Sequence, residues 1–297
     1  MESLMEGVTV VELAKWGFVP SSAAVLADWG ADVVKIEDPR MGDPIRQIGQ
    51  MGIGVSVGGD FNYMFEQLNR GKRSLPLDLV KPDAQNILRQ LIPATDVVLL
   101  NNRPDVAVKL GVDYETLSKI NPRLVYCELT GYGRKGPDAH LPGYDMILQA
   151  MSGLMAAEGK VIDDVPQQIS ASPLIDVTSG FCLTWSVCAA LYARERTGKG
   201  QKIETSLLAS GLALMGARFL EVDELDTENR SKSLEQMANK RASSSPYEEL
   251  RAASPGSQRY GHHGNIYYRV YLAKDGPLGI GCLNDRLRQR LLVTLDL

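Results

Sequence analysis

The first two hundred residues alternate short apolar runs with amphipathic segments of helical length, and this alternation constrains the fold more than any other feature. The run VTVVEL (residues 8–13) predicts a buried strand, residues 21–29 a helix, and DVVKIE (residues 32–37) a second strand. A strand, a helix and another strand in so short a span form a βαβ unit, whose strands are parallel. The chain therefore begins as an α/β protein.

The same alternation continues to about residue 220. It predicts further strands at residues 97–101, 124–129 and 201–205, and further helices at residues 82–91, 104–110, 114–120, 144–155, 177–194 and 206–220. In the first helix we expect Ser21 and Ser22 to cap the N-terminus. Together these patterns predict an open, Rossmann-like parallel sheet with helices on both faces.

The composition changes after about residue 221. Residues 223–258 are polar, charged and rich in serine, and they favour a solvated helix followed by a loop, or partial disorder. Residues 265–282 then predict a β-hairpin that turns at KDG, and residues 283–297 a helix. We expect a large domain over residues 1–205, a linker helix over residues 206–226, and a smaller α+β domain over residues 227–297 whose C-terminal part is missing.

Charge and apolar content exclude several classes of partner. A net charge of −4 is too small to indicate binding to nucleic acid or an anionic membrane. No apolar run reaches the length of a membrane span, and MESLMEGVTVVEL lacks the basic start of a secretory signal. The four cysteines show no zinc-site spacing, so we expect a reduced, cytoplasmic protein without a structural metal.

Two common catalytic motifs of α/β proteins are absent. The first strand–helix turn, LAKWGFVPSS, lacks the glycines that a dinucleotide pyrophosphate requires, so hydride transfer is disfavoured. GIGVSVGGD (residues 52–60) favours a mobile loop over a phosphate cradle. The nucleophile elbow GxSxG of α/β-hydrolases is missing as well. Carboxylates, tyrosines and amides remain as candidate chemical groups.

Asp176, in the stretch PLIDVTSG, is the acid that most needs an explanation. It lies between apolar residues and the predicted helix at residues 177–194. The local sequence favours a helix cap, because Asp is among the best N-cap residues. A catalytic carboxylate is the alternative, and a helix N-terminus would favour its ionised form by roughly 0.3–1 kcal/mol.

Basic residues gather just after the predicted strands, at the edge where open α/β sheets bind ligands. They are Arg40, Arg46, Lys72, Arg73, Arg103, Arg134 and Lys135. Each alone is an ordinary surface charge. As a set they favour a phosphorylated ligand.

Five blocks of the chain form a recognisable succession: VVELAKWGFVPSSAAVLADWGADVVKIEDPRMGDPIR, LNRGKRSLPLDL, LTGYGRKGPDAHLPGYDMILQAMSGLM, PLIDVTSGF and ARERTGKGQKIETSLL. They resemble the successive signatures of the class III coenzyme A transferases and of the related α-methylacyl-CoA racemases. The resemblance runs from about residue 6 to residue 220. It implies a Rossmann-like large domain, a smaller domain and an interlocked homodimer.

The resemblance also implies a chemistry. Asp176 would attack an acyl-CoA thioester to form an aspartyl anhydride, and the released CoA would convert this to an aspartyl-CoA thioester, which an acceptor carboxylate resolves. CoA is then a substrate and no cofactor is held permanently. Tyr144 stands where the racemases carry His, and a phenol with a pKa of about 10 is a poor base near neutral pH. Transfer is therefore favoured over racemisation, and a non-catalytic acyl-CoA-binding protein is the third reading if the chain is truncated.

The positions that match the CoA-binding blocks of the family are Lys72, Arg73, Asn101, Arg103 and Tyr144, with Arg40 and Arg46 as weaker candidates. Gly17 stands where some formyl-CoA transferases carry Gln, which puts oxalate or formate as a substrate in doubt. GHHGN (residues 261–265) is a poor match to the glycine loop of those enzymes. The expected partners are an acyl-CoA, a small carboxylic acid and a second copy of the chain.

Overall fold

The computed structural model describes residues 3–51, 62–255 and 265–297. The chain forms two compact units. The larger contains Met1–Glu158 and Gln168–Gly216, and the smaller contains Gly159–Gln167 and Ala217–Leu297. Both predicted glycine-containing loops, residues 52–60 and 261–265, fall mainly outside the described residues.

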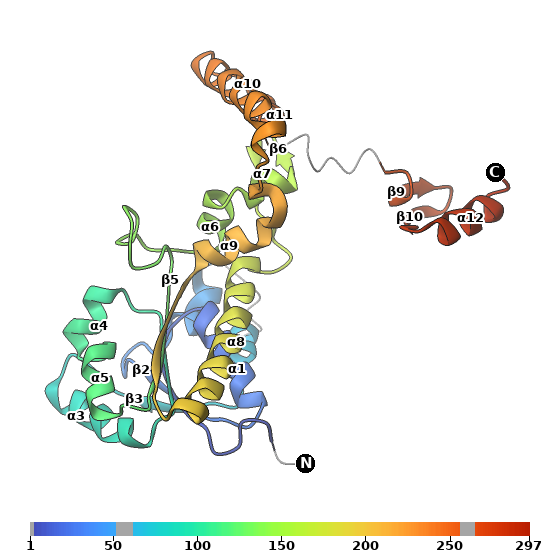
Figure 1. The fold of residues 1–297 in the computed structure, drawn as a ribbon. Helices are drawn as coiled ribbons and strands as arrows, with labels where there is room; N and C mark the ends of the chain where they lie inside the picture. Colours follow the sequence, from blue (N-terminus) through green and yellow to red (C-terminus); the bar gives the residue numbers. More distant parts are fainter. Residues whose placement is uncertain (1–2, 52–61, 256–264) are drawn as a thin grey trace. The chain divides into compact units, whose positions relative to one another are not determined.

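The larger unit is built on a six-stranded parallel sheet in the order β3-β2-β1-β4-β5-β8 (Figure 1). The strands are β1 (Thr9–Leu13), β2 (Asp32–Glu37), β3 (Arg73–Pro76), β4 (Val97–Leu100), β5 (Val125–Thr130) and β8 (Gln201–Ser206). Five of the six were predicted from the apolar runs. The edge strand β3, RSLP, was not, because it has no buried residue and no apolar run.

Helices cover both faces of this sheet, so the predicted fold class is confirmed (Figure 1). On one face lie α1 (Phe18–Asp28) and α8 (Leu174–Thr197), and on the other lie α3 (Pro82–Leu91), α4 (Pro104–Leu110) and α5 (Tyr114–Ile120). Alternate strand residues enter the two apolar cores: Val97 and Leu99 meet α1 and α8, whereas Val98 and Leu100 meet the other three helices. Burial on both sides explains why the central strand β4, VVLL, is continuously apolar.

Four predicted helices have different bounds in the structure. The helix at residues 144–155 is two helices, α6 (Asp145–Met151) and α7 (Leu154–Glu158), because Gly153 between them has a φ of +82°. The helix expected at residues 206–220 is α9 (Leu207–Met215), followed by a short 3-10 turn, Gly216–Phe219. The two helices that begin nearest the candidate site also start three residues earlier than predicted, at Phe18 and Leu174.

Other short elements complete the larger unit. The 3-10 helix η1 spans Pro44–Met51, α2 spans Tyr63–Asn69, and the 3-10 turn η2 spans Ile92–Ala94. Asn62 caps α2, since its side chain accepts hydrogen bonds from the amides of Met64 and Phe65.

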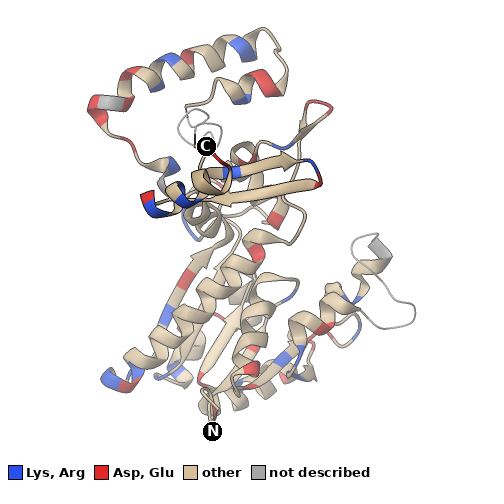
Figure 2. Ribbon diagram, turned by 90° about the vertical axis from the view of Figure 1, so that its right-hand side faces the viewer, with Lys and Arg blue, Asp and Glu red and all other residues tan. Residues whose placement is uncertain are grey.

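The smaller unit contains two helices, a hairpin and a terminal helix. They are α10 (Asp223–Ala242), α11 (Tyr247–Ala252), the antiparallel strands β9 (Tyr268–Ala273) and β10 (Gly276–Gly281), and α12 (Asp285–Thr294), together with the short ribbon β6 (Val161–Ile162) and β7 (Val165–Pro166). The predicted hairpin and the final helix are confirmed. Figure 2 shows acidic and basic residues along α10, acidic in its first turn and basic in its last, as the helix dipole favours.

Helix α8, at 24 residues, is long and largely apolar. Of the helices in the described residues, it alone is long and apolar enough to cross a membrane by length and composition. Its residues Ile175, Leu183 and Val187 are fully buried in the core that α1 shares. Core helices of globular proteins pass the same test of length and composition.

Helices α1 and α8 pack unusually closely at Gly180. A Cβ atom at this position would lie 2.9 Å from the backbone oxygen of Phe18 and would overlap the hydroxyl of Ser21. One turn further along, Thr184 donates a hydrogen bond to Ser22 over 3.0 Å. Ser21 and Ser22, which were expected to cap α1, therefore line its contact with α8 instead. The residue that precedes α1 is Gly17.

This contact generates a prediction for stability. We expect Gly180→Ala to lower the free energy of unfolding by about 1–3 kcal/mol, because the methyl group overpacks the contact with α1. The change should be destabilising although alanine favours a helix over glycine by about 1 kcal/mol. Chemical denaturation measures the difference, and Ala189→Gly, on the exposed side of the same helix, calibrates the intrinsic helix preference. A Gly180→Ala protein as stable as the parent would show that the two helices are not in tight contact.

Candidate active site

The candidate site lies at the carboxyl edge of the parallel sheet, between β1 and β4. The chain leaves β1 at Leu13, passes through residues 14–17 and enters α1 at Phe18. Helix α8 begins beside this turn, because α1 and α8 pack side by side along the same core. Open α/β sheets bind ligands at this edge.

Asp176 lies in the first turn of α8 and faces Gly17. A Cβ atom built on Gly17 would lie 2.6 Å from Asp176 Oδ2, so only glycine leaves room for this carboxylate in its present position. The other oxygen, Oδ1, is buried, and no described residue gives it a hydrogen bond. Asp176 is therefore a partly buried carboxylate with one oxygen left unsatisfied.

The interpretation of Asp176 as a helix cap is wrong. Helix α8 begins at Leu174, its N-cap residue is Pro173, and no side chain of that residue caps it. The first amides are instead capped from another helix. Asp145, the first residue of α6, accepts hydrogen bonds through Oδ1 from the amides of Ile175 over 2.7 Å and of Asp176 over 3.0 Å. The favourable place for an anion at the start of α8 is thus already occupied.

This arrangement changes the protonation of Asp176. Burial, and then the neighbouring Asp145 carboxylate, raise the pKa of Asp176 to about 7. We had expected the helix N-terminus to keep the carboxylate ionised. That expectation is wrong, because the dipole contributes only about 0.3–1 kcal/mol, whereas desolvation of a buried carboxylate and a like charge both act against it.

Gln149 holds Asp145 in place, and sequence reasoning did not identify it. Gln149 is completely buried and donates to Asp145 Oδ2 over 2.6 Å. Its amide also forms two hydrogen bonds with the backbone of Ile169, which orders the segment before α8. In the sequence, only the spacing of Gln149 one helical turn after Asp145 indicates this hydrogen bond, and such a spacing is a weak signal.

Tyr144 precedes Asp145 and is the N-cap residue of α6, where its side chain caps no amide and is 55% exposed. The chain reaches it through a loop that closes on itself, since a Cβ atom on Gly131 would lie 2.7 Å from Gly143 Cα. The close backbone contact between Gly131 and Gly143 thus fixes where the chain enters α6, and with it the position of Asp145 at the start of α8. The catalytic role of Tyr144 stays a prediction.

Asn101 links the two strand ends that flank the site. Its side chain accepts from the amide of Lys15 over 3.1 Å and donates to the carbonyl of Lys15 over 2.6 Å. Both bonds hold the turn between β1 and α1. Arg103, expected beside it at the nucleotide end of CoA, precedes α4 and lies 3.9 Å from Asp105 on an exposed surface.

A cavity of about 160 Å³ opens next to this turn, at the carboxyl ends of β1, β2 and β4. Its apolar lining includes Leu13, Ile36 and Leu79, and its polar lining includes Lys15, Asp38 and Asn102. Apolar walls with a few polar groups are typical of sites that bind small molecules. Two further carboxylates, Glu37 and Asp78, also line this cavity.

The other predicted CoA contacts have carboxylate partners within the chain. The side chain of Lys72 is 2% exposed and pairs with Glu12 over 2.6 Å, and burial lowers its pKa to about 8. Arg73 donates to Asp32 over 2.8 Å. The remaining two pairs are Arg40 with Asp38 and Arg46 with Glu37. Lys72 is thus turned into the protein, whereas the three arginines are at least partly exposed.

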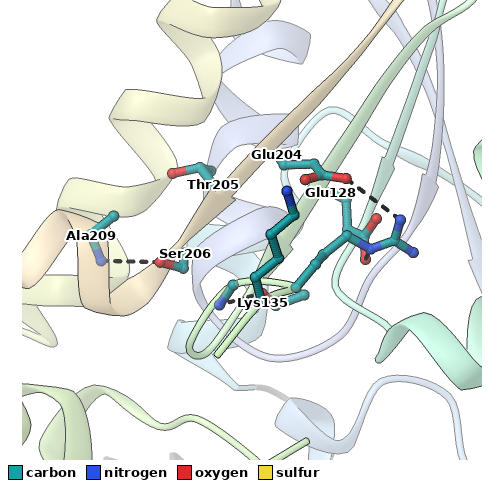
Figure 3. Close-up of a pocket in the computed structure, with 9 residues that line it drawn as sticks. Glu128, Lys135, Glu204, Thr205, Ser206 and Ala209 are labelled. Atoms are coloured by element: carbon teal, nitrogen blue, oxygen red, sulfur yellow. Dashed lines mark hydrogen bonds and ion pairs between the residues drawn. The ribbon is translucent and has the colours of Figure 1, made fainter. Parts of the chain in front are cut away.

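A second cavity, of about 390 Å³, lies at the ends of β5 and β8 (Figure 3). Buried Glu128 pairs there with Arg134 over 3.3 Å, and burial raises the pKa of its carboxyl. Figure 3 shows Lys135 pointing toward Glu204. Acidic and basic side chains are nearly balanced here, so this cavity does not favour an ion of either sign. Arg134 and Lys135, from the basic set expected to favour a phosphorylated ligand, line it, but none of the positions that match the family's CoA-binding blocks does.

Comparison with known proteins places the chain in a family. The model of CoA-transferase family III matches residues 5–297. The chain is 34% identical over 286 residues to the acetyl-CoA:oxalate CoA-transferase of Acetobacter aceti, and 38% identical over 205 residues to the succinate–glutarate CoA-transferase of Agrobacterium fabrum. These alignments cover 96% and 69% of this chain, and 65% and 51% of those proteins.

A comparison with solved structures supports the same family. A CAIB/BAIF family protein from Brucella suis matches with a TM-score of 0.74 and 32% identity, covering all of this chain and 70% of that one. The chain spans between about half and two thirds of the length of the curated relatives it matches. It belongs to CoA-transferase family III.

Proposed function

We propose that this protein, as part of a family III enzyme, transfers coenzyme A from an acyl-CoA to a carboxylic acid, with Asp176 as the nucleophile. The single observation that carries the proposal is the unsatisfied, partly buried carboxylate of Asp176, held against Gly17 at the ligand-binding edge of the sheet. The relatives named as CoA-transferases support the reaction class.

In the first proposed step, ionised Asp176 attacks the thioester carbonyl of the acyl-CoA. The new C–O bond gives a mixed anhydride, and the C–S bond breaks to release CoA as a thiolate. The developing oxyanion needs hydrogen-bond donors, and the first amides of α1, beside Gly17, have no carbonyl partner within their own helix.

In the second proposed step, the CoA thiolate attacks the aspartyl carbonyl of the anhydride and releases the donor carboxylate. In the third step, the acceptor carboxylate attacks the aspartyl carbonyl of the resulting aspartyl-CoA thioester, which forms a new anhydride and releases CoA as a thiolate. In the fourth step, this thiolate attacks the acceptor's acyl carbon in the new anhydride. Acyl-CoA product forms and Asp176 is regenerated as a carboxylate. Each step exchanges one acyl bond for another, so no oxidant or metal is required.

The environment of Asp176 suits covalent catalysis. Burial destabilises the ionised carboxylate, as the raised pKa records, but it does not penalise the neutral anhydride or thioester in the same way. Asp145, hydrogen-bonded to the amide of Asp176, acts on the same balance through its negative charge. The site therefore favours the covalent intermediates relative to the free nucleophile.

We place the nucleotide end of CoA in the cavity at the ends of β1, β2 and β4. Its apolar walls suit a base, and Lys15 and Asn102 at its rim suit the phosphates and ribose. Arg103 and Arg40 remain candidates for phosphate contacts because both are exposed. The burial of Lys72 argues against a direct contact with a phosphate.

Tyr144 favours transfer over racemisation, the second candidate function. An α-proton exchange near neutral pH requires a base such as histidine, and a tyrosine hydroxyl with an ordinary pKa of about 10 does not supply it. A protein that only binds acyl-CoA is the third possibility, and the following experiment separates it from an enzyme.

We expect Asp176→Asn to reduce CoA transfer by at least about 10³-fold while leaving CoA binding nearly unchanged, because it removes the nucleophile without removing volume. Activity is measured with a panel of acyl-CoA donors and mono- and dicarboxylate acceptors. Intact-mass analysis of the parent protein incubated with acyl-CoA should show a CoA thioester at Asp176.

Asp105→Asn, an exposed carboxylate on α4, is the matched control and should retain full activity. Transfer that persists in the Asp176→Asn protein would contradict the assignment. Binding of CoA without transfer by the parent protein would favour the third possibility, and exchange of the α-proton without transfer would favour the second.

The raised pKa predicts a dependence on pH. Asp176 must be ionised to attack, so kcat/KM should fall as the pH decreases through about 7. The stability of the fold should change with pH in the opposite direction to kcat/KM, decreasing as the pH rises. Because the folded-state pKa lies above the usual unfolded value near 4, ionised Asp176 destabilises the fold increasingly from pH 4 to 7 and fully above 7.

Asp176→Asn should therefore raise the free energy of unfolding by roughly 1–3 kcal/mol at pH 8 and by much less at pH 4. Denaturation of both proteins at the two pH values measures this. An equal effect at both pH values would contradict the raised pKa.

We also propose that the active form is a homodimer. Helix α8 exposes an apolar stripe formed by Phe181, Trp185 and Tyr192, of which 48%, 65% and 65% of the surface is accessible in the single chain. Such a stripe is typical of a protein interface. Light scattering should give twice the chain mass, and Trp185→Glu should shift it toward the monomer, whereas a monomeric parent would contradict the proposal.

A further inference from the structure

Four charged side chains form a buried cluster beneath the turn that faces Asp176. They are Glu12, Lys35, Asp43 and Lys72, each 2% exposed or less at its side chain. Lys35 Nζ lies 2.7 Å from Glu12 Oε1 and 3.0 Å from Asp43 Oδ2, and Lys72 Nζ lies 2.6 Å from Glu12 Oε2. A buried cluster of this kind is costly to form, so it calls for a role beyond stability.

The cluster bonds directly to the backbone of the turn between β1 and α1. Lys35 donates to the carbonyl of Ala14 over 2.9 Å, and Asp43 Oδ1 accepts from the amide of Trp16 over 3.1 Å. Lys72 donates to the carbonyl of Pro20, in the first turn of α1, over 2.9 Å. Three points of the chain around Gly17 are therefore held by charged groups.

Trp16 has a left-handed backbone, with a φ of +69°. This conformation is unfavourable for a residue with a Cβ atom and persists only where the surroundings hold it. Two bonds fix the peptide unit that leads into Trp16: Asp43 accepts from the Trp16 amide, and Asn101 donates to the carbonyl of Lys15 over 2.6 Å. Of the two, the bond to Asp43 is made to Trp16 itself. The next residue is Gly17, whose Cα lies against Asp176 Oδ2.

Asp43 is itself held from several directions. Its Oδ1 also accepts from the amide of Ile45 over 3.1 Å, and its own amide donates to Glu37 Oε1 over 3.0 Å. Burial alone would lower the pKa of Lys35, but the Glu12 and Asp43 carboxylates outweigh it and raise the pKa, so Lys35 stays charged beside Asp43. The carboxylate therefore has little freedom to move away from Trp16.

We propose that Asp43 is a positioning residue, which holds the left-handed turn at Trp16 and thereby keeps Gly17 packed against the Asp176 carboxylate. Asp43 does not touch the reacting atoms. Loss of its bond to Trp16 would let the turn relax to a right-handed backbone, move Gly17 and admit water to Asp176. The catalytic consequence rests on the proposed role of Asp176, whereas the placement of the turn does not.

Two substitutions of Asp43 separate positioning from stability. Asp43→Asn keeps an oxygen that accepts from Trp16 and Ile45 but loses the charge opposite Lys35, so the protein should be less stable, with a kcat per folded molecule within about threefold of the parent. Asp43→Ala loses the acceptor as well, and kcat should fall by about 10–100-fold with KM nearly unchanged, as expected for a misplaced reacting group.

The protonation of Asp176 gives a readout that does not require activity. Carbon-13 NMR of labelled aspartate should show the pKa of Asp176 close to the parent value in Asp43→Asn and shifted downward in Asp43→Ala, because water reaches the carboxylate. A purely structural role predicts equal kcat per folded molecule and an unchanged Asp176 pKa in both variants, and that result would overturn the proposal.

A second pair of variants tests the turn even if Asp43→Ala does not fold. Trp16→Gly and Trp16→Ala both lose the indole, but only glycine adopts a positive φ without strain. The glycine variant should have a melting temperature about 2–4 °C higher than the alanine variant, and an Asp176 pKa closer to that of the parent. Equal stability and equal pKa values would overturn the proposal. If the parent forms no CoA adduct, the proposed function fails, yet these two readouts still decide the role of Asp43.

Discussion

The close packing of α1 against α8 is the constraint on which the site depends. Gly180 lets the two helices approach until the backbone of one meets the side chains of the other, and Ser22 and Thr184 bond across the contact. The contact between Gly17 and Asp176 lies four residues before the one between Ser21 and Gly180 on both helices, that is, one helical turn. The packing of the core thus brings the start of α1 to the carboxylate of α8.

Electrostatics then determines what this carboxylate can do. A helix N-terminus ordinarily stabilises an anion, but in α8 the amides of the first turn are bonded to Asp145. The side chain of Asp176 therefore keeps a buried oxygen, Oδ1, without a hydrogen-bond partner among the described residues. The fold therefore uses Asp145 to satisfy the helix amides and leaves one oxygen of Asp176 without a hydrogen bond, while Gly17, which follows the left-handed Trp16, packs against the other oxygen.

Features of the molecule that leave a local pattern in the sequence could be predicted, whereas features that depend on tertiary contacts could not. The strands and most helices of the sheet could be predicted, since burial on both faces produces apolar runs that any reader of the sequence sees. Strand β3 could not, because an exposed edge strand has no such signal. Asp176 could be chosen as a candidate catalytic residue because the neighbouring sequence resembles a known family, but the burial and hydrogen bonding around it could not be predicted. Asp145 lies thirty-one residues away in sequence, and only the tertiary contact reveals that it replaces Asp176 as the cap. Lys72 shows the same limit, because a lysine after a loop is indistinguishable in sequence from one that pairs with buried Glu12.

The most direct test of this account is the titration of Asp176 itself, by carbon-13 NMR of labelled aspartate in the parent protein and in Asp145→Asn. We expect a pKa near 7 for Asp176 in the parent. In Asp145→Asn the pKa should be lower, since the like charge is removed, yet still above the usual value near 4, since burial remains the larger cause. A parent pKa near 4, unchanged by the substitution, would contradict the picture of a desolvated nucleophile beside a capping carboxylate.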